Sequence, residues 1–298
     1  MSKSMKFVIR THSFDDRVGG IIALHLLCRR LVDAGQEAIL WPIDRPTLEP
    51  LQRPRSVLGW LRYHLTGRRK VFNHGPFLTK RAGFNDLRNA VVVYPEVTAG
   101  NPLHARHVVR WLLHKPGFHT GRVEFGERDL LFAYQDAFDE SARPAQRGGR
   151  LTLIWQNEAY VDRGRADRSG SAYLVKKGTG RPLVHDLSNS ILVDDLSHAE
   201  KADVFNRVQY FYTYDPYTLY SRYAAICGCI PVIIPPPGLS KQAWVAREEE
   251  RYGLAYGTEE IPWAVATRDL LLKRIVEEQV EERLMVQNFI SRCREHFG

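Results

Sequence analysis

The segment YFYTYDPYTLYSRYAAICGCIPVIIP, residues 210–235, constrains the fold more than any other part of the chain. Its β-prone aromatic run stops at Asp215 and Pro216, and apolar residues at helical spacing follow from 217 to 227. Gly228 suits the position just after a helix, where a positive φ costs glycine little, and 230–234 is a β-branched run typical of a buried parallel strand. The segment therefore predicts a strand, a turn, a helix and a second strand of a parallel α/β sheet.

The turn at Asp215 is the part of this segment best suited to bind a ligand. In a parallel α/β sheet, ligands bind beyond the carboxyl ends of the strands, and the first turn of the next helix offers unpaired N–H groups to an anion. We expect Asp215 to hold sugar hydroxyls, and Tyr217, Thr218 and Ser221 to lie beside a diphosphate. An ordinary unit whose Asp-Pro turn merely starts a helix explains the same residues equally well.

Charge and composition narrow the possible partners. A net charge of +8 and a pI near 9.3 favour an anionic partner, such as a nucleotide diphosphate, nucleic acid or an anionic membrane surface. The basic residues are dispersed and no recognition motif appears, so we expect no nucleic-acid partner. Without a signal-peptide core or an apolar run near the roughly 20 residues that span a bilayer, the protein is expected to be cytoplasmic. The four scattered cysteines are expected to be reduced core residues.

A basic segment at 53–70 interleaves arginine and lysine with tryptophan, leucine and tyrosine. A short helix of this kind can lie on the inner face of an anionic membrane. It can equally cap a domain core with its basic face in solvent. Both interpretations remain open at this point, and the first would make the protein peripheral to the membrane.

At 298 residues the chain is long enough for two domains. A Pro/Gly/Arg-rich stretch at 141–149 suggests the boundary, with a first domain at 1–147 and a second at 148–262. The run LTLIW at 151–155 is predicted as the first strand of the second domain. Residues 263–298 are almost continuously helical in pattern, with an apolar face formed by Leu270, Leu271, Ile275, Val276, Val280, Leu284 and Phe289.

The first domain offers three candidate ligand positions. Gly19 and Gly20 follow a predicted strand at 6–11 and open a helix, so a diphosphate or an acceptor could approach the backbone there. Glu96 follows the buried strand predicted at 90–94 and is the carboxylate best placed to act as a base, although an exposed loop glutamate is the competing interpretation. Asn101 lies in the same loop. A helix is predicted at 104–114. In the second domain helices are predicted at 199–208, where Ser197 and Glu200 suggest a capped start, and at 238–251.

In the second domain, Lys177 and Arg181 lie among glycines and suit phosphate oxygens, although a solvated basic turn explains them too. The loop is not a Walker A sequence, which argues against an NTPase. No histidine, cysteine or Asp-x-Asp cluster has ligand spacing, so we expect no bound metal.

The motif YSRYAAICGCIPVIIP, followed by ERYGLAYG at 250–257, resembles the donor-binding half of GT-B glycosyltransferases. Together with GGIIALHLLCRRL, YPEVTAGNPL and KKGTGRPLVHDL, it is similar to bacterial glycosyltransferases of lipopolysaccharide, O-antigen and capsule biosynthesis, over residues 19–257. The resemblance implies an α/β chain with two Rossmann-like domains whose parallel sheets face a cleft, and a C-terminal helix that crosses back. One departure is Tyr223, which stands where retaining members often have a second glutamate.

The resemblance also implies an activity: metal-independent transfer of a hexose from a nucleotide-diphosphate sugar to a glycan or lipid-linked acceptor, with no further cofactor. Donor contacts would come from Lys177, Arg181, Tyr217, Thr218 and Ser221. Asp215 and Glu96 would act in catalysis, and Gly19, Gly20 and Asn101 would line the acceptor or phosphate side. Two alternatives stay open: a nucleotide-sugar epimerase on the same fold, and a catalytically silent nucleotide-sugar-binding or scaffold protein.

Overall fold

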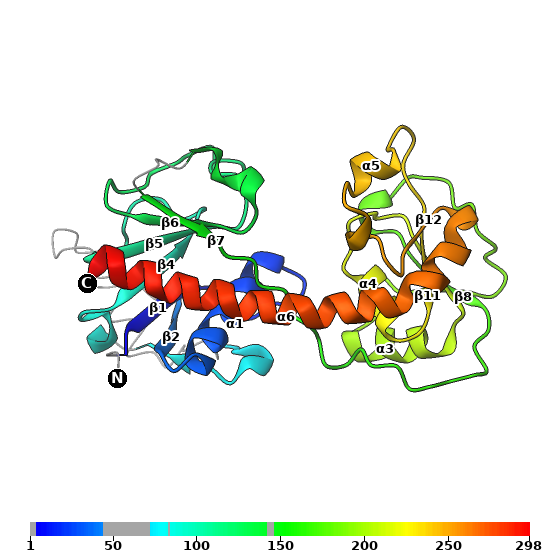
Figure 1. Cartoon of the computed structure of the whole chain (residues 1–298), viewed down its shortest axis with the longest axis horizontal. Coiled ribbons are helices and arrows are strands. Elements are labelled where there is room, and N and C mark those ends of the chain that lie inside the picture. The colour runs from blue at the N-terminus through cyan, green and yellow to red at the C-terminus, as the bar shows by residue number, and fades with distance from the viewer. Residues whose placement is uncertain (1–3, 44–71, 83, 142–145) are drawn as a thin grey trace, which may run out of the picture. The chain divides into compact units, whose positions relative to one another are not determined.

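The computed structural model describes residues 4–43, 72–82, 84–141 and 146–298. The chain divides into two compact units, each with its own sheet and core (Figure 1). Unit 1 comprises residues 1–155 and 280–298, and unit 2 comprises residues 156–279. The basic segment at 53–70 lies outside the described residues.

Unit 1 is built on a sheet of seven parallel strands in the order β3-β2-β1-β4-β5-β6-β7. Its strands are β1 (Lys6–Thr11), β2 (Glu37–Pro42), β3 (Lys80–Arg81), β4 (Val91–Pro95), β5 (His107–Leu112), β6 (Leu130–Ala133) and β7 (Arg147–Arg150). Its α-helical parts in the described chain are α1 (Gly19–Asp33) and the C-terminal half of α6 (Ile261–Phe297). The strand order reverses between β1 and β4, the point in such sheets where ligands usually bind.

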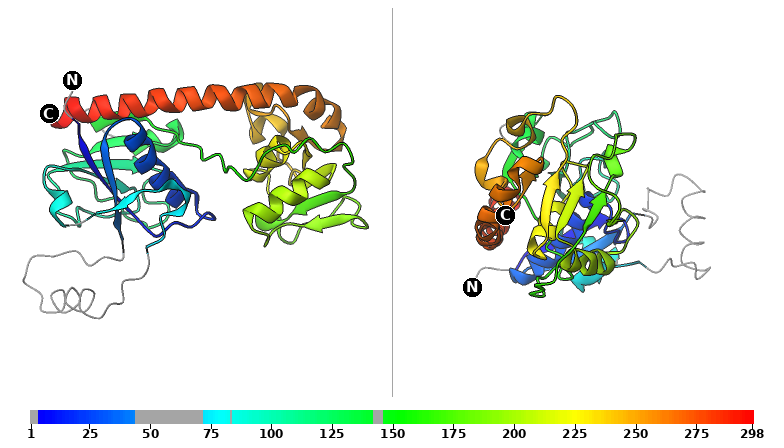
Figure 2. Two further views of the ribbon diagram at one scale, coloured as in Figure 1. Left: turned by 90° about the horizontal axis from the view of Figure 1, so that it is seen from below. Right: turned by 90° about the vertical axis from the view of Figure 1, so that its right-hand side faces the viewer.

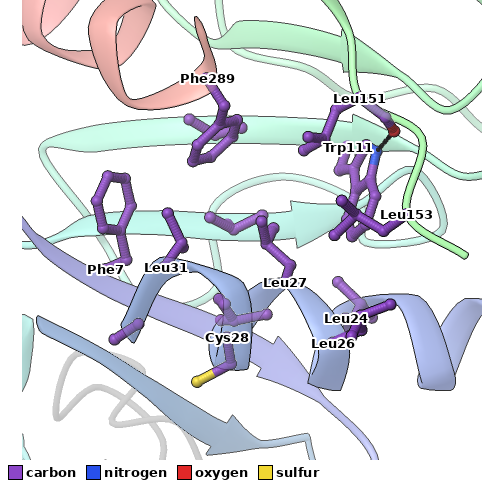
Figure 3. Packing of buried hydrophobic residues seen from close by; sticks show 14 of the residues in the cluster. Phe7, Leu24, Leu26, Leu27, Cys28, Leu31, Trp111, Leu151, Leu153 and Phe289 are labelled. Carbon is purple, nitrogen blue, oxygen red and sulfur yellow. Dashed lines mark hydrogen bonds between the residues drawn. The ribbon is translucent and has the colours of Figure 1, made fainter. Parts of the chain in front are cut away.

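Both faces of the unit 1 sheet are buried. On one face Phe7 and Ile9 of β1 pack with leucines of α1 and with Phe289 of α6 (Figure 3). Trp111 of β5 lies in the same core, and its Nε1–H donates to the carbonyl of Leu151 at 3.0 Å (Figure 3). On the opposite face, Val8 and other residues form a second apolar cluster. Burial on both faces explains why the strands are continuous apolar runs rather than alternating ones.

Unit 2 has a sheet of five parallel strands in the order β12-β11-β10-β8-β9. Its strands are β8 (Ser171–Leu174), β9 (Ser190–Leu192), β10 (Tyr210–Thr213), β11 (Ile230–Ile233) and β12 (Ala255–Tyr256), and its helices are α3 (His198–Arg207), α4 (Tyr220–Ile226), α5 (Lys241–Trp244) and the first half of α6. Short 3-10 helices of the chain lie at Gly75–Phe77, Phe84–Leu87, Asp136–Ser141, Lys176–Gly178, Glu248–Glu250 and Thr258–Glu260. The strand order reverses between β8 and β10.

The two parallel sheets confirm the predicted α/β class with two Rossmann-like parts. The strand, turn, helix and strand predicted from residues 210–235 are β10, the Asp215 turn, α4 and β11. Gly228 follows α4 with a φ of +87°, and Ser197 and Glu200 form a capping box at the start of α3. The predicted C-terminal helix is α6, one continuous helix that can be followed in Figure 2. No helix in the described ranges is long and apolar enough to cross a membrane.

The segment 151–155 departs from prediction. It is not a strand of unit 2, because Leu151 and Leu153 pack in the core of unit 1. Tyr134 Oη–H donates to the carbonyl of Leu153 at 3.0 Å, which ties the segment to β6. Unit 1 thus runs to residue 155 rather than to the expected 147, and it also takes in residues 280–298 of α6.

Two predicted helices are also wrong. Residues 104–114 form no helix, and β5 instead occupies their centre and pairs with β4 and β6. Residues 238–251 hold only the four-residue α5 and a short 3-10 helix. All four cysteines, by contrast, are free and buried as predicted.

Candidate functional site

A cavity of about 770 Å³ lies at the carboxyl edge of the unit 1 sheet, where the strand order reverses. Its walls come from the loop after β1, the start of α1, and the residues that follow β2, β4 and β5. The lining residues are His12, Ser13, Asp15, Val18, Gly20, Ile21, Leu24, Ile43, Pro95, Glu96, Val97, Leu113, His114 and His119. Because the strands are parallel, the residues that follow them all lie at the same edge.

Glu96 is the buried carboxyl group of this cavity. It is 6% exposed, and its Oε2 accepts the backbone N–H of Leu113 at 3.0 Å. Burial raises the pKa of Glu96; the N–H donors of Glu96 and Leu113 and the nearby His119 and His114 oppose that rise. A carboxylate whose affinity for a proton is increased in this way is suited to take a proton from a bound hydroxyl group.

The second carboxylate in the wall, that of Asp15, is already hydrogen-bonded to Arg17. Both of its oxygens accept from the Arg17 guanidinium at 2.9 Å, and Oδ1 also accepts the Arg17 backbone N–H at 3.0 Å. These bonds hold the pKa of Asp15 below its usual value. Asp15 therefore stays ionised and paired, which makes it a poor proton acceptor.

Two histidines stand beside Glu96. The ring of His114 packs against Phe118 at 4.3 Å and Phe138 at 5.1 Å, and its buried Nδ1 has no hydrogen-bond partner among the described residues. His119 is exposed, with its ring 4.9 Å from that of His114. Both imidazoles can donate to or accept from a ligand in the cavity.

The expected Gly19 and Gly20 start α1, and Gly20 lines the cavity. A Cβ atom would meet nothing within 4 Å at Gly19, and only Leu113 Cδ1 at 3.5 Å at Gly20. The fold itself therefore does not require glycine at either position. Val18, the residue before the helix, gives it no side-chain cap.

Asn101, expected on the acceptor or phosphate side, is hydrogen-bonded within the loop between β4 and β5. Its Oδ1 accepts from the Tyr94 hydroxyl at 2.9 Å and from the Ala105 N–H at 3.0 Å, and its Nδ2 donates to the Ala105 carbonyl at 2.8 Å. The amide thus holds the loop between β4 and β5, and Asn101 is not among the cavity residues.

In unit 2, Asp215 lies at the carboxyl end of β10, beside the reversal point of that sheet. It is 4% exposed, and its Oδ1 accepts the Tyr217 N–H at 3.3 Å. The Thr213 hydroxyl bonds to both the backbone carbonyl and the N–H of Asp215, at 2.9 and 3.2 Å. These contacts fix the turn and leave Oδ2 without a described hydrogen bond.

Arg181 joins the ends of β10 and β11. Its Nη1 donates to the Tyr214 carbonyl at 2.8 Å, and its Nη2 donates to the carbonyls of Ile234 and Pro235 at 2.9 and 2.7 Å. No ion pair of Arg181 is found within the described ranges, so its charge is solvated by carbonyl groups rather than cancelled. It therefore supplies positive potential at this edge, although most of its N–H donors are used by the fold.

The neighbouring Lys177 lies on the 3-10 helix Lys176–Gly178, which follows β8. Tyr217 is 61% exposed, and the Thr218 hydroxyl accepts the Tyr220 N–H at 3.4 Å. Ser221 lies one turn further on, 3% exposed, with its hydroxyl unbonded among the described residues. Four of the predicted donor residues therefore gather at one edge, while Ser221 is buried in α4.

Tyr223, which occupies the position of the missing glutamate, belongs to the core of unit 2. Its ring stacks on Tyr160 at 4.1 Å and 4°, and burial raises the pKa of Tyr223 to about 12. This side chain is not placed to bind a ribose.

Gly178 makes the closest backbone contact at the carboxyl edge of unit 2. A Cβ atom built there would lie 2.5 Å from the Tyr214 carbonyl oxygen. We expect Gly178→Ala to lower the free energy of unfolding of unit 2 by about 1–3 kcal/mol, because the β10 end must move. Urea unfolding tests this, with Gly19→Ala as the control, since that position is open and should lose no stability. Equal effects of the two variants would contradict the close contact.

His114 and His119 were not identified as candidate site residues from the sequence. The signal was present, because His114 lies two residues and His119 seven residues after the run 107–112, and a strand there would have placed this loop at the edge that carries Glu96. Because a helix was predicted at 104–114, these two histidines were not placed at that edge. Among the described residues, no group of three His, Cys, Asp or Glu side chains could hold a metal ion.

Comparisons with known proteins give fold-level likenesses only. No protein-family model matches the sequence, and neither does any curated protein. Similar solved structures include sucrose-phosphate synthase from Thermosynechococcus elongatus (9% identity, TM-score 0.42, covering 99% of this chain and 95% of that one). They also include an alpha-glucosyltransferase in complex with UDP and DNA (10% identity, TM-score 0.41, covering 97% of this chain and 96% of that one). A third is a putative UDP-N-acetylglucosamine 2-epimerase from Listeria monocytogenes (8% identity, TM-score 0.34, covering 97% of this chain and 91% of that one). With TM-scores below 0.5, these likenesses carry no argument about function.

Proposed function

We propose that the chain is a glycosyltransferase that moves a sugar from a nucleotide-diphosphate sugar to the hydroxyl group of an acceptor. The observation that carries the proposal is Glu96, a buried carboxylate with a raised pKa in a large cavity at the reversal point of a parallel sheet. A group in this position suits removal of a proton from an alcohol.

The proposal assigns the acceptor to unit 1 and the donor to unit 2. The acceptor oxygen forms a bond to the sugar C1 as the bond from C1 to the diphosphate oxygen breaks. The bonding electron pair leaves with the diphosphate, and the acceptor proton passes to Glu96. Arg181 and Lys177 would neutralise the leaving diphosphate without a metal, and Asp215 would hold the donor sugar.

The biological setting of the proposal is carried by the sequence resemblance alone. Under it, the donated sugar is a hexose and the acceptor is a glycan or a lipid-linked molecule of bacterial surface polysaccharide synthesis. A second candidate, a silent nucleotide-sugar-binding protein, is favoured by one observation: the second acidic position holds the buried Tyr223.

A thermal-shift screen against a panel of sugar nucleotides tests the binding step. A ligand at 100 times its dissociation constant adds about 2.7 kcal/mol of stability, which is readily seen. Release of nucleotide diphosphate only when an acceptor is added supports transfer. Binding without turnover supports the silent binder, conversion of the donor without an acceptor supports an epimerase, and no binding at all overturns the proposal.

Asp215→Asn is expected to weaken binding of the sugar nucleotide about 10-fold or more, because a charged hydrogen bond to the sugar becomes a neutral one. The asparagine oxygen can still accept the Tyr217 N–H, so the turn should persist. Isothermal titration calorimetry measures the change, with the exposed Asp195→Asn as a matched control in the same unit. Unchanged affinity in Asp215→Asn would remove this residue from the donor site.

A further inference from the structure

The wall of the unit 1 cavity is mainly apolar. Its apolar residues come from four separate segments of unit 1, so the apolar character of the wall does not depend on one loop. They are Val18, Ile21, Leu24, Ile43, Pro95, Val97 and Leu113. Val18 and Val97 are also solvent-exposed, at 44% and 40%. Apolar side chains left open to water inside a cavity favour an apolar ligand over a hydrated one.

The polar lining residues are His12, Ser13, Asp15, Glu96, His114 and His119, and some of their polar atoms already have hydrogen-bond partners. Asp15 is held by Arg17, and the Ser13 hydroxyl accepts the Asn73 N–H at 3.3 Å. Glu96 keeps one oxygen on the Leu113 N–H, and the buried Nδ1 of His114 has no partner within the described chain. A free sugar would bring several hydroxyl groups, each of which needs a partner when buried. This wall offers polar partners around Glu96, where His114 and His119 also lie, and at His12, whereas the part formed by Val18, Ile21 and Leu24 is aliphatic.

The lining residues also include no Phe, Tyr or Trp. The rings of Phe118 and Phe138 pack against His114 rather than facing the cavity as lining residues. A sugar ring would therefore find only the imidazoles of His12, His114 and His119 as planar surface, and no benzene or indole ring. An alkyl or isoprenoid group, in contrast, gains simply by leaving water.

From this arrangement we infer that the acceptor is an alcohol whose hydroxyl group is attached to an apolar body, with the hydroxyl at Glu96 and the body along the aliphatic wall. The reaction class rests on the proposed function above, whereas the binding preference rests on the cavity alone. The same bonds form and break as in that reaction, and the alcohol proton passes to Glu96.

Binding of 1-octanol and of methyl β-glucoside to the full chain tests the inference by isothermal titration calorimetry. We expect 1-octanol to bind and methyl β-glucoside to give no heat at the same concentration. Ile21→Ser should weaken octanol binding about 10-fold, because one aliphatic part of the wall becomes polar. Ile22→Ser is the matched control, because Ile22 is the next residue of α1, is also half-buried and is not a lining residue. Val97→Ser, in a loop, repeats the test without changing a helix.

Equal binding of the two probes, no binding of octanol, or equal effects of Ile21→Ser and Ile22→Ser would each overturn the inference. Its failure can be told from failure of the proposed function. If sugar nucleotides bind and methyl β-glucoside serves as the better acceptor, the function stands and the apolar acceptor falls. If octanol binds as expected and no sugar nucleotide binds, the apolar cavity stands and the glycosyltransferase proposal falls.

Discussion

Glu96→Gln is expected to lower kcat for sugar transfer by about 10²- to 10⁴-fold, the usual contribution of a positioned general base. Glutamine has nearly the same shape and its oxygen can still accept the Leu113 N–H, so the cavity should keep its form. The amide cannot take up the acceptor proton. KM for the donor, which is assigned to unit 2, should change little. The measurement is steady-state release of nucleotide diphosphate in the presence of an acceptor.

A matched control is available in the same unit. Glu124 is an exposed loop glutamate that is not a lining residue, so Glu124→Gln should leave kcat unchanged. A loss of less than about tenfold in Glu96→Gln would mean that another group takes the proton. His114 would then be the first residue to replace, since it lines the same wall.

The pH dependence gives an independent check on Glu96. Its pKa is raised above the ordinary 4.5, chiefly by burial, so the base is active only at pH values above that raised pKa. We expect kcat/KM to rise with pH through it. The protonated form of Glu96 stabilises the folded state at low pH. This stability is lost as pH rises through the raised pKa, because the ionised carboxylate is poorly solvated in its buried position. Glu96→Gln should therefore be at least as stable as the wild type at pH 7, and a flat pH profile would count against the assignment.

The parts of the fold that could be predicted were those in which local sequence and tertiary structure agree. The strand, turn and helix around Asp215 carry three independent signals, namely an aromatic run, a turn dipeptide and a glycine after the helix. Ser197 and Glu200 gave the start of α3 in the same way, because a capping box is a local hydrogen-bond pattern.

The run 107–112 could not be assigned in this way. Val108, Val109, Trp111 and Leu112 are all buried, and an apolar run of this length fits a buried helix or a buried strand equally well. Only its pairing with β4 and β6 decides the matter, and pairing is not a local property. His114 and His119 were missed for the same reason.

The segment 151–155 and part of the apolar face of α6 were also mispredicted, because their packing partners are not evident from the local sequence. The apolar pattern around Leu151 and Leu153 predicts a strand. Their carbonyls instead accept hydrogen bonds from the side chains of Trp111 and Tyr134, which are distant in sequence. In α6 the expected face included Val276, Val280 and Leu284, which are all more than half exposed. Leu271, Ile275 and Phe289 of that face are buried as expected, and Val286, Ile290 and Cys293, which lie outside it, are buried as well. A long helix that contributes to two cores has no single apolar face for the pattern to reveal.

Arg110→Ala is expected to cost unit 1 about 3–5 kcal/mol, the usual loss when one partner of a buried ion pair is removed. Arg110 is fully buried; its Nε donates to Asp129 at 2.6 Å, its Nη1 donates to the Thr98 carbonyl at 2.8 Å, and its Nη2 donates to the Gly100 carbonyl. Alanine would leave a buried carboxylate, the buried Thr98 carbonyl and the half-buried Gly100 carbonyl without these donors. Hydrogen exchange of a peptide covering β5, followed in urea, reports the stability of unit 1 separately from unit 2. The exposed Arg106→Ala should stay within about 0.5 kcal/mol.

The same substitution should also reduce activity, because Thr98 and Gly100 belong to the loop that begins at Glu96. Arg110→Met combined with Asp129→Leu removes both charges, and we expect it to be more stable than Arg110→Ala, since no buried charge is left uncompensated. The double variant still lacks the donors to Thr98 and Gly100, so its kcat should stay low even where its stability recovers. If stability and kcat both recover in the double variant, Arg110 serves the fold alone. If stability recovers and kcat stays low, the hydrogen bonds from Arg110 to the Thr98 and Gly100 carbonyls hold Glu96 in its working position.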